Sequence, residues 1–318
     1  MNRSGTACAA AHARSFTGIT TTMHSADHAT TGTNASSASP PAGMQDEPPL
    51  PERRVAQRRA TDTAERRRAT DTSQSTQTEL SLPVKMLAQP DETTCGPTCL
   101  HAVYGYWGDH EPLDGIIKRT GRLEEGGTFA VFLACDALRK GYRATIYTYN
   151  LNVFDPTWFG HRDINIAERL QRQREVKMDY RLQQATTGYL EFLALGGDLR
   201  LTDMSYGLIE GMLRRQLPIL TGLSSTYLYR GKREYGPDSL PDDVRGTPAG
   251  HFVVIAGYNQ TTRKVLVVDP YQLNPYGGPN EYWIGIDRVL AAVLLGIVTH
   301  DANLLIIHPP HRSQRGTS

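Results

Sequence analysis

A cysteine, a histidine and an aspartate stand in this chain in an order that could support thiol chemistry. Cys95 opens the segment CGPTCL, His251 opens the apolar segment HFVVIAGY, and Asp269 closes the segment VLVVD. In thiol acyl transfer a cysteine attacks as the thiolate, a histidine removes its proton, and an acidic residue orients the imidazole. The residue types and their chain order therefore predict a nucleophilic site built on Cys95.

The surroundings of Cys95 favour an ionised thiol. The sequence predicts a helix over 94–107, with Pro97 in its first turn and Gly108 after its end. Backbone N–H groups and the positive dipole at a helix N-terminus stabilise a thiolate, as does a neighbouring imidazolium. We interpret Gly96 as leaving room for a substrate backbone. The alternative is that Cys95 is a buried structural cysteine.

His251 and Asp269 belong to two predicted strands, 251–258 and 264–269. Five residues separate these strands, a length typical of a β-hairpin. The end of the second strand then lies beside the start of the first, so Asp269 can fix the tautomer of His251. The alternatives are a hydrogen-bonded core histidine and an aspartate that only shapes the turn before Pro270.

Gln89 is the fourth candidate, six residues before Cys95. Its side-chain amide and the Cys95 backbone N–H could stabilise the oxyanion that forms during acyl transfer. This spacing is weak evidence by itself. Cys99, one turn after Cys95, is predicted to be a core residue, because two thiols without a third ligand make a poor zinc site and an i, i+4 disulfide is strained in a helix. Cys135 lies among predicted helix core positions and is also expected to be a core residue. Cys8 is uninformative.

Composition limits the classes of function. The 318 residues are 39% hydrophobic and 21% charged, as in soluble globular proteins. A net charge of +1 gives no basic field for nucleic acid, and no apolar run approaches the roughly 20 residues that span a bilayer. There is no secretory signal pattern, and four cysteines form no disulfide framework. A reduced thiol nucleophile indicates the cytoplasm.

The sequence predicts three regions. Residues 1–80 are rich in Ser, Thr and Arg, lack Lys, and repeat RRATDT with a nine-residue period, so we expect a disordered tail. Its arginine cluster could bind an acidic partner or could simply be solvated. Residues 81–310 form the folded domain, with a helical insertion at about 150–200, and 311–318 are expected to be a disordered end.

Within the domain, predicted helices come first and antiparallel strands later, which is typical of an α+β fold. A short strand is expected at 82–87, and a helix at 202–215 that begins with a Thr202 or Asp203 cap. The loop 226–247 is rich in Tyr, Arg, Gly and Pro. We predict that it borders the Cys95 cleft and sets specificity. Its aromatic residues could equally be ordinary core or surface residues.

These motifs together resemble the C39-like cysteine peptidases. The resemblance is carried by Gln89 with the Cys95 segment, by Gly250-His251-Phe252-Val253-Val254 and by Asp269-Pro270. It implies a papain-like fold, with an N-terminal helix carrying the Cys and a C-terminal antiparallel sheet carrying His and Asp. It also implies that Cys95, His251, Asp269 and Gln89 act as nucleophile, base, orienting residue and oxyanion donor.

The best-known members of that family are domains of ABC exporters that cut leader peptides after a double glycine. This sequence lacks the membrane segments and P-loop of the exporters and has Thr94 where an Asp is common. It looks more like a stand-alone member, so double-glycine specificity is not carried over.

The expected function is that of a cysteine peptidase-like hydrolase that cleaves a peptide or amide bond through a thioester on Cys95. Its partner would be a peptide or protein substrate, and no metal or organic cofactor is expected. Two alternatives use the same residues. One is a papain-like acyltransferase or transglutaminase-type enzyme, and the other is a non-catalytic peptide-binding module.

Overall fold

The computed structural model describes residues 78–309, except 125, 161–162 and 279. By its internal contacts the chain divides into Met1–Thr72 and Ser73–Ser318, and every described residue belongs to the second unit. The predicted tail lies outside the described residues apart from its last three, and so does the predicted end at 311–318.

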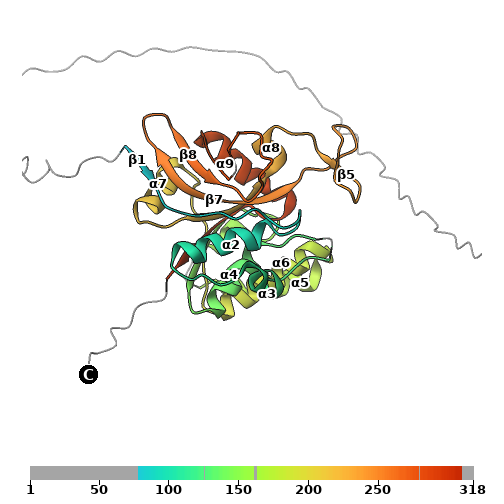
Figure 1. Ribbon diagram of the computed structural model, residues 1–318. Helices are drawn as coiled ribbons and strands as arrows, with labels where there is room; N and C mark the ends of the chain where they lie inside the picture. The colour runs from blue at the N-terminus through green and yellow to red at the C-terminus, as the bar shows by residue number, and fades with distance from the viewer. Residues whose placement is uncertain (1–77, 125, 161–162, 279, 310–318) are drawn as a thin grey trace, which may run out of the picture. The chain divides into compact units, whose positions relative to one another are not determined.

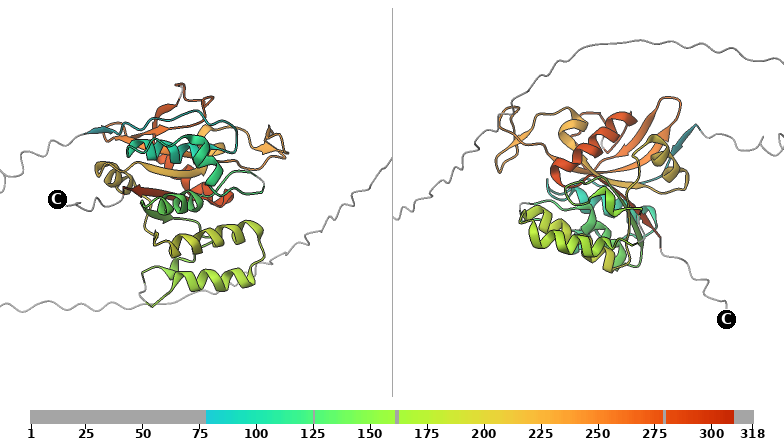
Figure 2. Two further views of the ribbon diagram at one scale, coloured as in Figure 1. Left: turned by 60° about the horizontal axis from the view of Figure 1, so that its bottom comes forward. Right: turned by 180° about the vertical axis from the view of Figure 1, so that it is seen from behind.

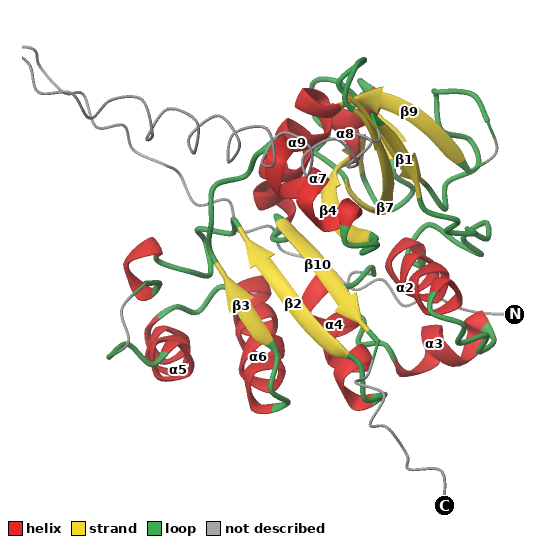
Figure 3. Ribbon diagram, turned by 90° about the vertical axis from the view of Figure 1, so that its left-hand side faces the viewer, coloured by secondary structure: helices red, strands yellow, loops and turns green. Residues whose placement is uncertain are grey.

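The centre of the domain is a mixed sheet with the strand order β3-β2-β10-β4-β7-β8-β9, in which β1 also pairs with part of β7; Figure 1 labels β1, β7 and β8, and Figure 3 labels the other strands of this sheet. Only β2 and β3 are parallel, and the other neighbouring strands are antiparallel. The strands are β1 Glu79–Ser81, β2 Arg143–Thr148, β3 Asp198–Arg200, β4 Ile219–Ser224, β7 Gly250–Asn259, β8 Lys264–Val268, β9 Glu281–Gly285 and β10 Asn303–His308. A separate small hairpin pairs β5, Glu234–Tyr235, with β6, Leu240–Pro241.

Helices cover both faces of this sheet (Figures 1 and 3). Helices α2 and α4 pack on one side, where α3 packs against α2 and the pair α5 and α6 packs outside α4; α7 and α9 lie on the other side (Figure 2). The helices are α2 Cys95–Tyr106, α3 Leu113–Arg119, α4 Ala130–Arg139, α5 Ile166–Val176, α6 Tyr180–Ala194, α7 Tyr206–Arg214, α8 Ser225–Tyr229 and α9 Ile286–Leu295, with short 3₁₀ turns at Pro156–Trp158 and Gly296–Thr299.

The apolar runs of the central strands follow from this double cover. Every residue of β4 is buried, as are the seven residues from Phe252 to Tyr258 in β7. A strand that is buried on both faces reads as a continuous apolar run rather than as an alternating one. The sheet and the two helix layers therefore form one hydrophobic core, from which the ends of β7 and β8 emerge.

Close packing of α2 against β7 requires the glycine after Cys95. A Cβ atom on Gly96 would lie 2.6 Å from Thr128 Cγ2 and 3.3 Å from the Phe252 ring. One turn later, the Cys99 thiol donates to the Phe252 carbonyl at 3.3 Å. The interpretation that Gly96 leaves room for a substrate is wrong, because Thr128 and Phe252 fill the space where its side chain would be.

The predicted α+β class is confirmed, and α2 packs on the antiparallel part of the sheet as expected for a papain-like fold. The strand expected at 82–87 is wrong: β1 ends at Ser81, and pairing extends only to a bond from Leu82 N to Ala256 O at 2.7 Å. Pro83 follows, and a proline has no N–H with which to continue a strand ladder.

The helix expected at 202–215 is shorter than predicted. Helix α7 spans Tyr206–Arg214, and Ser205, rather than Thr202 or Asp203, caps it by accepting from Leu208 N at 3.2 Å. Serine is as good a cap as aspartate, and it directly precedes the amphipathic segment. The predicted insertion contains α5, α6 and the short strand β3.

The buried carboxyl group of Asp301, just before β10, makes the stability of the fold depend on pH. Asp301 accepts from Ala130 N, the first N–H of α4, at 2.7 Å and is also bonded to Asn303. Burial raises the pKa of Asp301 to about 7, against the opposing effect of these two hydrogen bonds. Because the folded pKa lies above the unfolded value, its stabilising contribution is complete below about pH 4 and is lost as the pH rises through about 7.

We therefore expect Asp301→Asn to flatten the pH dependence of stability. Between about pH 5 and pH 9 the wild type should lose about 2–3 kcal/mol more of its free energy of unfolding than the variant does. Urea denaturation at several pH values measures both proteins, with exposed Asp287→Asn as the control. Parallel profiles for wild type and Asp301→Asn would contradict the expectation.

Candidate active site

The β7–β8 hairpin brings His251 and Asp269 together. Val254 pairs with Val268 in the register of these strands, so Asp269 follows opposite Val253. Residues two apart on a strand share one face. His251 therefore projects from the same face as Val253, diagonally across from Asp269, as the hairpin in the sequence predicted.

A hydrogen bond of 2.9 Å joins His251 Nε2 to Asp269 Oδ1. Both groups are enclosed: the His251 side chain is 9% exposed and that of Asp269 is fully buried. Burial alone lowers the pKa of His251, but its hydrogen bonds to Asp269 and Cys95 outweigh burial and raise that pKa to about 10. The site therefore favours an imidazolium at neutral pH.

Asp269 is surrounded by hydrogen-bond donors. Its Oδ1 also accepts the backbone N–H of Tyr271 at 2.9 Å, and its Oδ2 accepts the hydroxyls of Tyr229 at 2.7 Å and Tyr282 at 2.8 Å. Burial favours the neutral acid, but hydrogen bonds from His251, Tyr229 and the Tyr271 N–H hold the pKa of Asp269 below its ordinary value. The carboxylate is therefore ionised although it is inaccessible to water.

Cys95 is the first residue of helix α2 and lies on the other side of His251 from Asp269. The imidazole uses Nε2 for Asp269, which leaves Nδ1 for the side-chain hydrogen bond with Cys95 that contributes to the high pKa of His251. The first turn of α2 contains no acidic residue, and no side chain caps it. Its N–H groups, which have no partner within the helix, are thus available to an anion.

Gln89 lies against the turn that follows Asp269, because its backbone N–H donates to the Pro270 carbonyl at 3.0 Å. Its side-chain nitrogen donates to the Asp91 carbonyl at 2.9 Å. Its side-chain oxygen is buried and has no hydrogen-bond partner among the described residues. The structure places Gln89 beside the site, and its action on an oxyanion stays a prediction.

The sequence alone did not identify the two tyrosines that donate to Asp269. Tyr229 ends α8 and Tyr282 lies in β9, 40 and 13 residues from the aspartate in sequence. Tyrosine is common in this chain and no local motif marks these two. The one available signal was that Tyr229 falls within the loop 226–247, which was predicted to border the site.

That loop begins and ends next to His251. Ala249 lies two residues before His251. Its carbonyl accepts from Ser225 N at 3.0 Å, and its own N–H donates to Thr226 Oγ1 at 2.9 Å. Tyr229 reaches from it to Asp269. The loop thus borders the candidate site, and its effect on specificity stays a prediction.

The other described thiols are core residues, as predicted. Cys99 is 0% and Cys135 is 1% exposed. Burial raises the pKa of both, that of Cys135 to about 12 and that of Cys99 well above its ordinary value. Cys8 lies outside the described residues. Nowhere in the described part of the chain do three His, Cys, Asp or Glu side chains converge to hold a metal ion.

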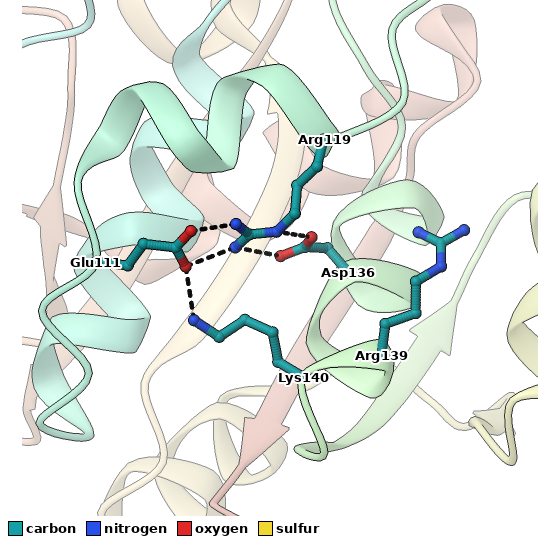
Figure 4. A pocket seen from close by; sticks show the side chains of 5 residues that line it. All are labelled: Glu111, Arg119, Asp136, Arg139 and Lys140. Atoms are coloured by element: carbon teal, nitrogen blue, oxygen red, sulfur yellow. Dashed lines mark hydrogen bonds and ion pairs between the residues drawn. The ribbon is translucent and has the colours of Figure 1, made fainter.

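A pocket beside α3 and α4 is a different kind of site (Figure 4). It is lined by Glu111, Arg119, Asp136, Arg139 and Lys140 and contains none of the four candidate residues. Its charged side chains are all engaged in ion pairs: Arg119 pairs with Glu111 and Asp136, Lys140 with Glu111 and with Asp109, and Arg139 with Glu191 outside the pocket. Among the described residues, no helix combines the length and apolar content needed to cross a membrane.

The assignment of the high pKa of His251 to Asp269 can be tested with Asp269→Asn. In a Cys95→Ala background, which removes the hydrogen bond from the thiol, we expect this change to lower the pKa of His251 by about 1–3 units, because a neutral amide stabilises an imidazolium less than a carboxylate does. NMR titration of labelled histidine measures the value. Asp301→Asn, which also alters a buried carboxyl group, is the control, and an unchanged His251 pKa in Asp269→Asn would remove the carboxylate as the cause.

The chain is similar to known proteins. The similar solved structures include three at 12% identity each: a double glycine motif protease from an AMS/PCAT transporter in complex with the leader peptide (TM-score 0.34, covering 72% of this chain and 94% of that one), a C39-like peptidase from Bacillus anthracis (0.38, 72% and 96%) and xylellain, a cysteine protease from Xylella fastidiosa (0.35, 73% and 85%). No curated protein matches the chain. The model of the Peptidase_C39 like family matches residues 81–284, which is more than half of the chain. The chain therefore belongs to the Peptidase_C39 like family.

Proposed function

We propose that this protein is a cysteine peptidase-like hydrolase that cleaves a peptide or amide bond through a thioester on Cys95. One observation carries the proposal. The His251 imidazole bonds to the buried Asp269 carboxylate at 2.9 Å, and the neighbouring Cys95 thiol, together with Asp269, raises the pKa of His251. In this arrangement Cys95 is the nucleophile, His251 the base and Asp269 the residue that orients the base.

In the acylation half of the reaction, His251 Nδ1 takes the proton of Cys95, and the thiolate attacks the carbonyl carbon of the substrate. The tetrahedral intermediate collapses when His251 returns the proton to the leaving nitrogen and the C–N bond breaks. A thioester on Cys95 remains, and the amine departs. The high pKa of His251 favours the thiolate–imidazolium pair from which this sequence starts.

In the second half, a water molecule gives its proton to His251 and attacks the thioester. The C–S bond breaks, the acid is released, and the thiolate–imidazolium pair is restored. Asp269 stays ionised throughout and holds Nε2–H, so the same ring nitrogen faces the thiol in both halves.

The developing oxyanion needs donors. The backbone N–H of Cys95, at the start of α2, is one candidate. Gln89 supplies the second after a half-turn about its terminal side-chain bond, which exchanges the amide nitrogen with the buried, unpartnered oxygen. In the structure the amide nitrogen donates to the Asp91 carbonyl at 2.9 Å.

We infer that the protein acts in the cytoplasm on a peptide or protein substrate. Cys95, Cys99 and Cys135 are all free thiols, and a thiol nucleophile requires a reducing compartment. A nucleophile at a helix terminus next to a long loop suits an extended peptide that enters between helix and sheet.

A peptide-library digest tests the activity. Wild type should release new N-termini, whereas Cys95→Ala should release none, because no other described thiol is placed beside the base. Cys135→Ala, a core thiol on α4, is the matched control and should retain cleavage. Peptides conjugated to an added amine, in place of free acids, would instead indicate acyl transfer, and equal cleavage by Cys95→Ala would end the proposal.

Gln89→Ala tests the oxyanion role. We expect a rate lower by about 10²-fold or more, the usual effect of removing one oxyanion donor, with little change in substrate affinity. Steady-state kinetics on a peptide from the digest measures both quantities. Gln183→Ala, which removes a glutamine that bonds only to backbone carbonyls near the end of α5, is the control. Unchanged turnover in Gln89→Ala would demote Gln89 to a packing residue.

A further inference from the structure

Two tyrosine hydroxyls donate to the same oxygen of the buried aspartate. Tyr229 reaches Asp269 Oδ2 at 2.7 Å and Tyr282 reaches it at 2.8 Å. His251 Nε2 and the Tyr271 N–H occupy the other oxygen, each at 2.9 Å. A carboxylate has about four lone-pair positions, so every acceptor position of Asp269 is filled.

This division of donors fixes the direction of the carboxylate. With Oδ2 held by two hydroxyls, the plane of the group cannot turn, and Oδ1 is the oxygen that faces the imidazole. Burial also removes the water that would stabilise the charge, so a fully enclosed Asp269 must obtain that stabilisation from donors in the protein. The two phenols supply half of them.

The two tyrosines are suited to remain donors. Burial and the neighbouring Asp269 charge raise the pKa of both Tyr229 and Tyr282 far above the ordinary value, so both hydroxyls keep their protons at any physiological pH. They come from different parts of the fold, the end of α8 and the second position of β9.

We propose that Tyr229 and Tyr282 are positioning residues that keep Asp269 ionised and aligned with His251, and thereby extend the thiolate–imidazolium pair of Cys95 to lower pH. This inference rests on the proposed function of the site. Both hydroxyls act through Asp269, while the Tyr229 ring also packs against the His251 ring at 6.1 Å, a contact that a phenylalanine retains.

The pH dependence of the thiolate–imidazolium pair is determined by a small set of groups. The titratable or charged side chains that face Asp269 and its partners include those of Cys95 and Cys99 from α2, Tyr229 from α8, His251 from β7, Tyr271 and Tyr276 from the loop between β8 and β9, Tyr282 from β9, and Arg288 from α9, which donates to the Tyr276 hydroxyl. The pKa of Cys99 is raised by burial and by the charges of Cys95 and Asp269, so Cys99 stays a neutral thiol. Asp269 is the acidic group that must stay ionised as the pH falls.

The experiment measures the rate at which iodoacetamide alkylates Cys95 between about pH 4 and pH 9. Mass spectrometry of the peptide that contains Cys95 distinguishes it from the other thiols. The variants are Tyr229→Phe, Tyr282→Phe and the double variant, each of which keeps the aromatic ring. Tyr276→Phe is the matched control, because its hydroxyl donates to the Leu228 carbonyl and its ring packs 4.6 Å from that of Tyr282, but it donates nothing to Asp269.

In wild type the rate should hold a plateau through neutral pH and fall on an acid limb. Loss of one hydroxyl should move that limb up by about one pH unit, since a hydrogen bond to a charged group has an effect of this size. The alkylation rate on the limb then falls about tenfold, with the plateau retained. The double variant should move the limb further, and Tyr276→Phe should leave it in place.

An acid limb that stays at its wild-type position in the double variant would overturn the inference. So would an equal shift in Tyr276→Phe, because that would indicate a general effect of the aromatic cluster. If the buried Tyr282→Phe does not fold, partly exposed Tyr229→Phe alone decides. A wild-type rate that rises only above about pH 8, as for an isolated thiol, would instead remove the ion pair and with it the proposed function.

Discussion

The interaction on which the rest of this structure depends is the hydrogen bond between His251 and the buried carboxylate of Asp269. Removing an ion from water costs several kcal/mol even after the protein relaxes, and an unpaired buried carboxylate would simply take up a proton. Asp269 stays charged because donors reach it from β7, from α8, from β9 and from the turn after β8. The high pKa of His251 therefore depends on three features of the fold. These are the register of the hairpin, the position of α8 at the end of β4 and the pairing of β9 with β8. The energetics of folding and the chemistry of the site are linked at one residue.

Cys95 is fixed against this sheet by contacts of the residues just beside it. Cys99, one turn after Cys95, donates its thiol to the carbonyl of Phe252, the residue next to His251. Gly96, on the other side of Cys95, allows α2 to approach Thr128 and the Phe252 ring closely. Cys95 and His251 thus belong to separate elements that are joined at neighbouring positions. Cys99 and Gly96 set the distance between helix and sheet, so the second thiol of the CGPTC segment has a packing role, while Cys95 lies beside His251.

Sequence reasoning located Cys95, His251 and Asp269 because each stands at the edge of an element whose pattern is strong. The apolar runs of β7 and β8 and the short loop between them determine the register, and the register determines the contact. Tyr229 and Tyr282 could not be found in the same way, since their contact with Asp269 depends on how α8 and β9 fold back, which no local pattern records. The prediction of a strand at 82–87 was wrong for a related reason. Strand β1 exists because β4 pairs with β7 only as far as Ile255, which leaves Gly257 to Asn259 open to another strand. Gln89 shows that the sequence does not determine the direction of a side chain. The sequence predicted that Gln89 lies near the site, but the direction of the side-chain amide depends on hydrogen bonds, here to the Asp91 carbonyl.

The segment between β4 and β7 connects this buried site to the surface. Its two ends are tied together by hydrogen bonds of Ala249 with Ser225 and Thr226, and Tyr229 anchors it to Asp269. Farther out it forms the β5–β6 hairpin, where Tyr235, Leu240 and Val244 are 43%, 60% and 81% exposed. A segment built in this way is held where it touches the Asp269 carboxylate and free to vary where it meets solvent. Changes of sequence at the tip would alter what the hairpin contacts without disturbing the donors around Asp269, because the root of the segment supplies the Tyr229 hydroxyl and the bonds of Ala249. The exposed surface of this segment can therefore vary independently of the hydrogen bonds around Asp269.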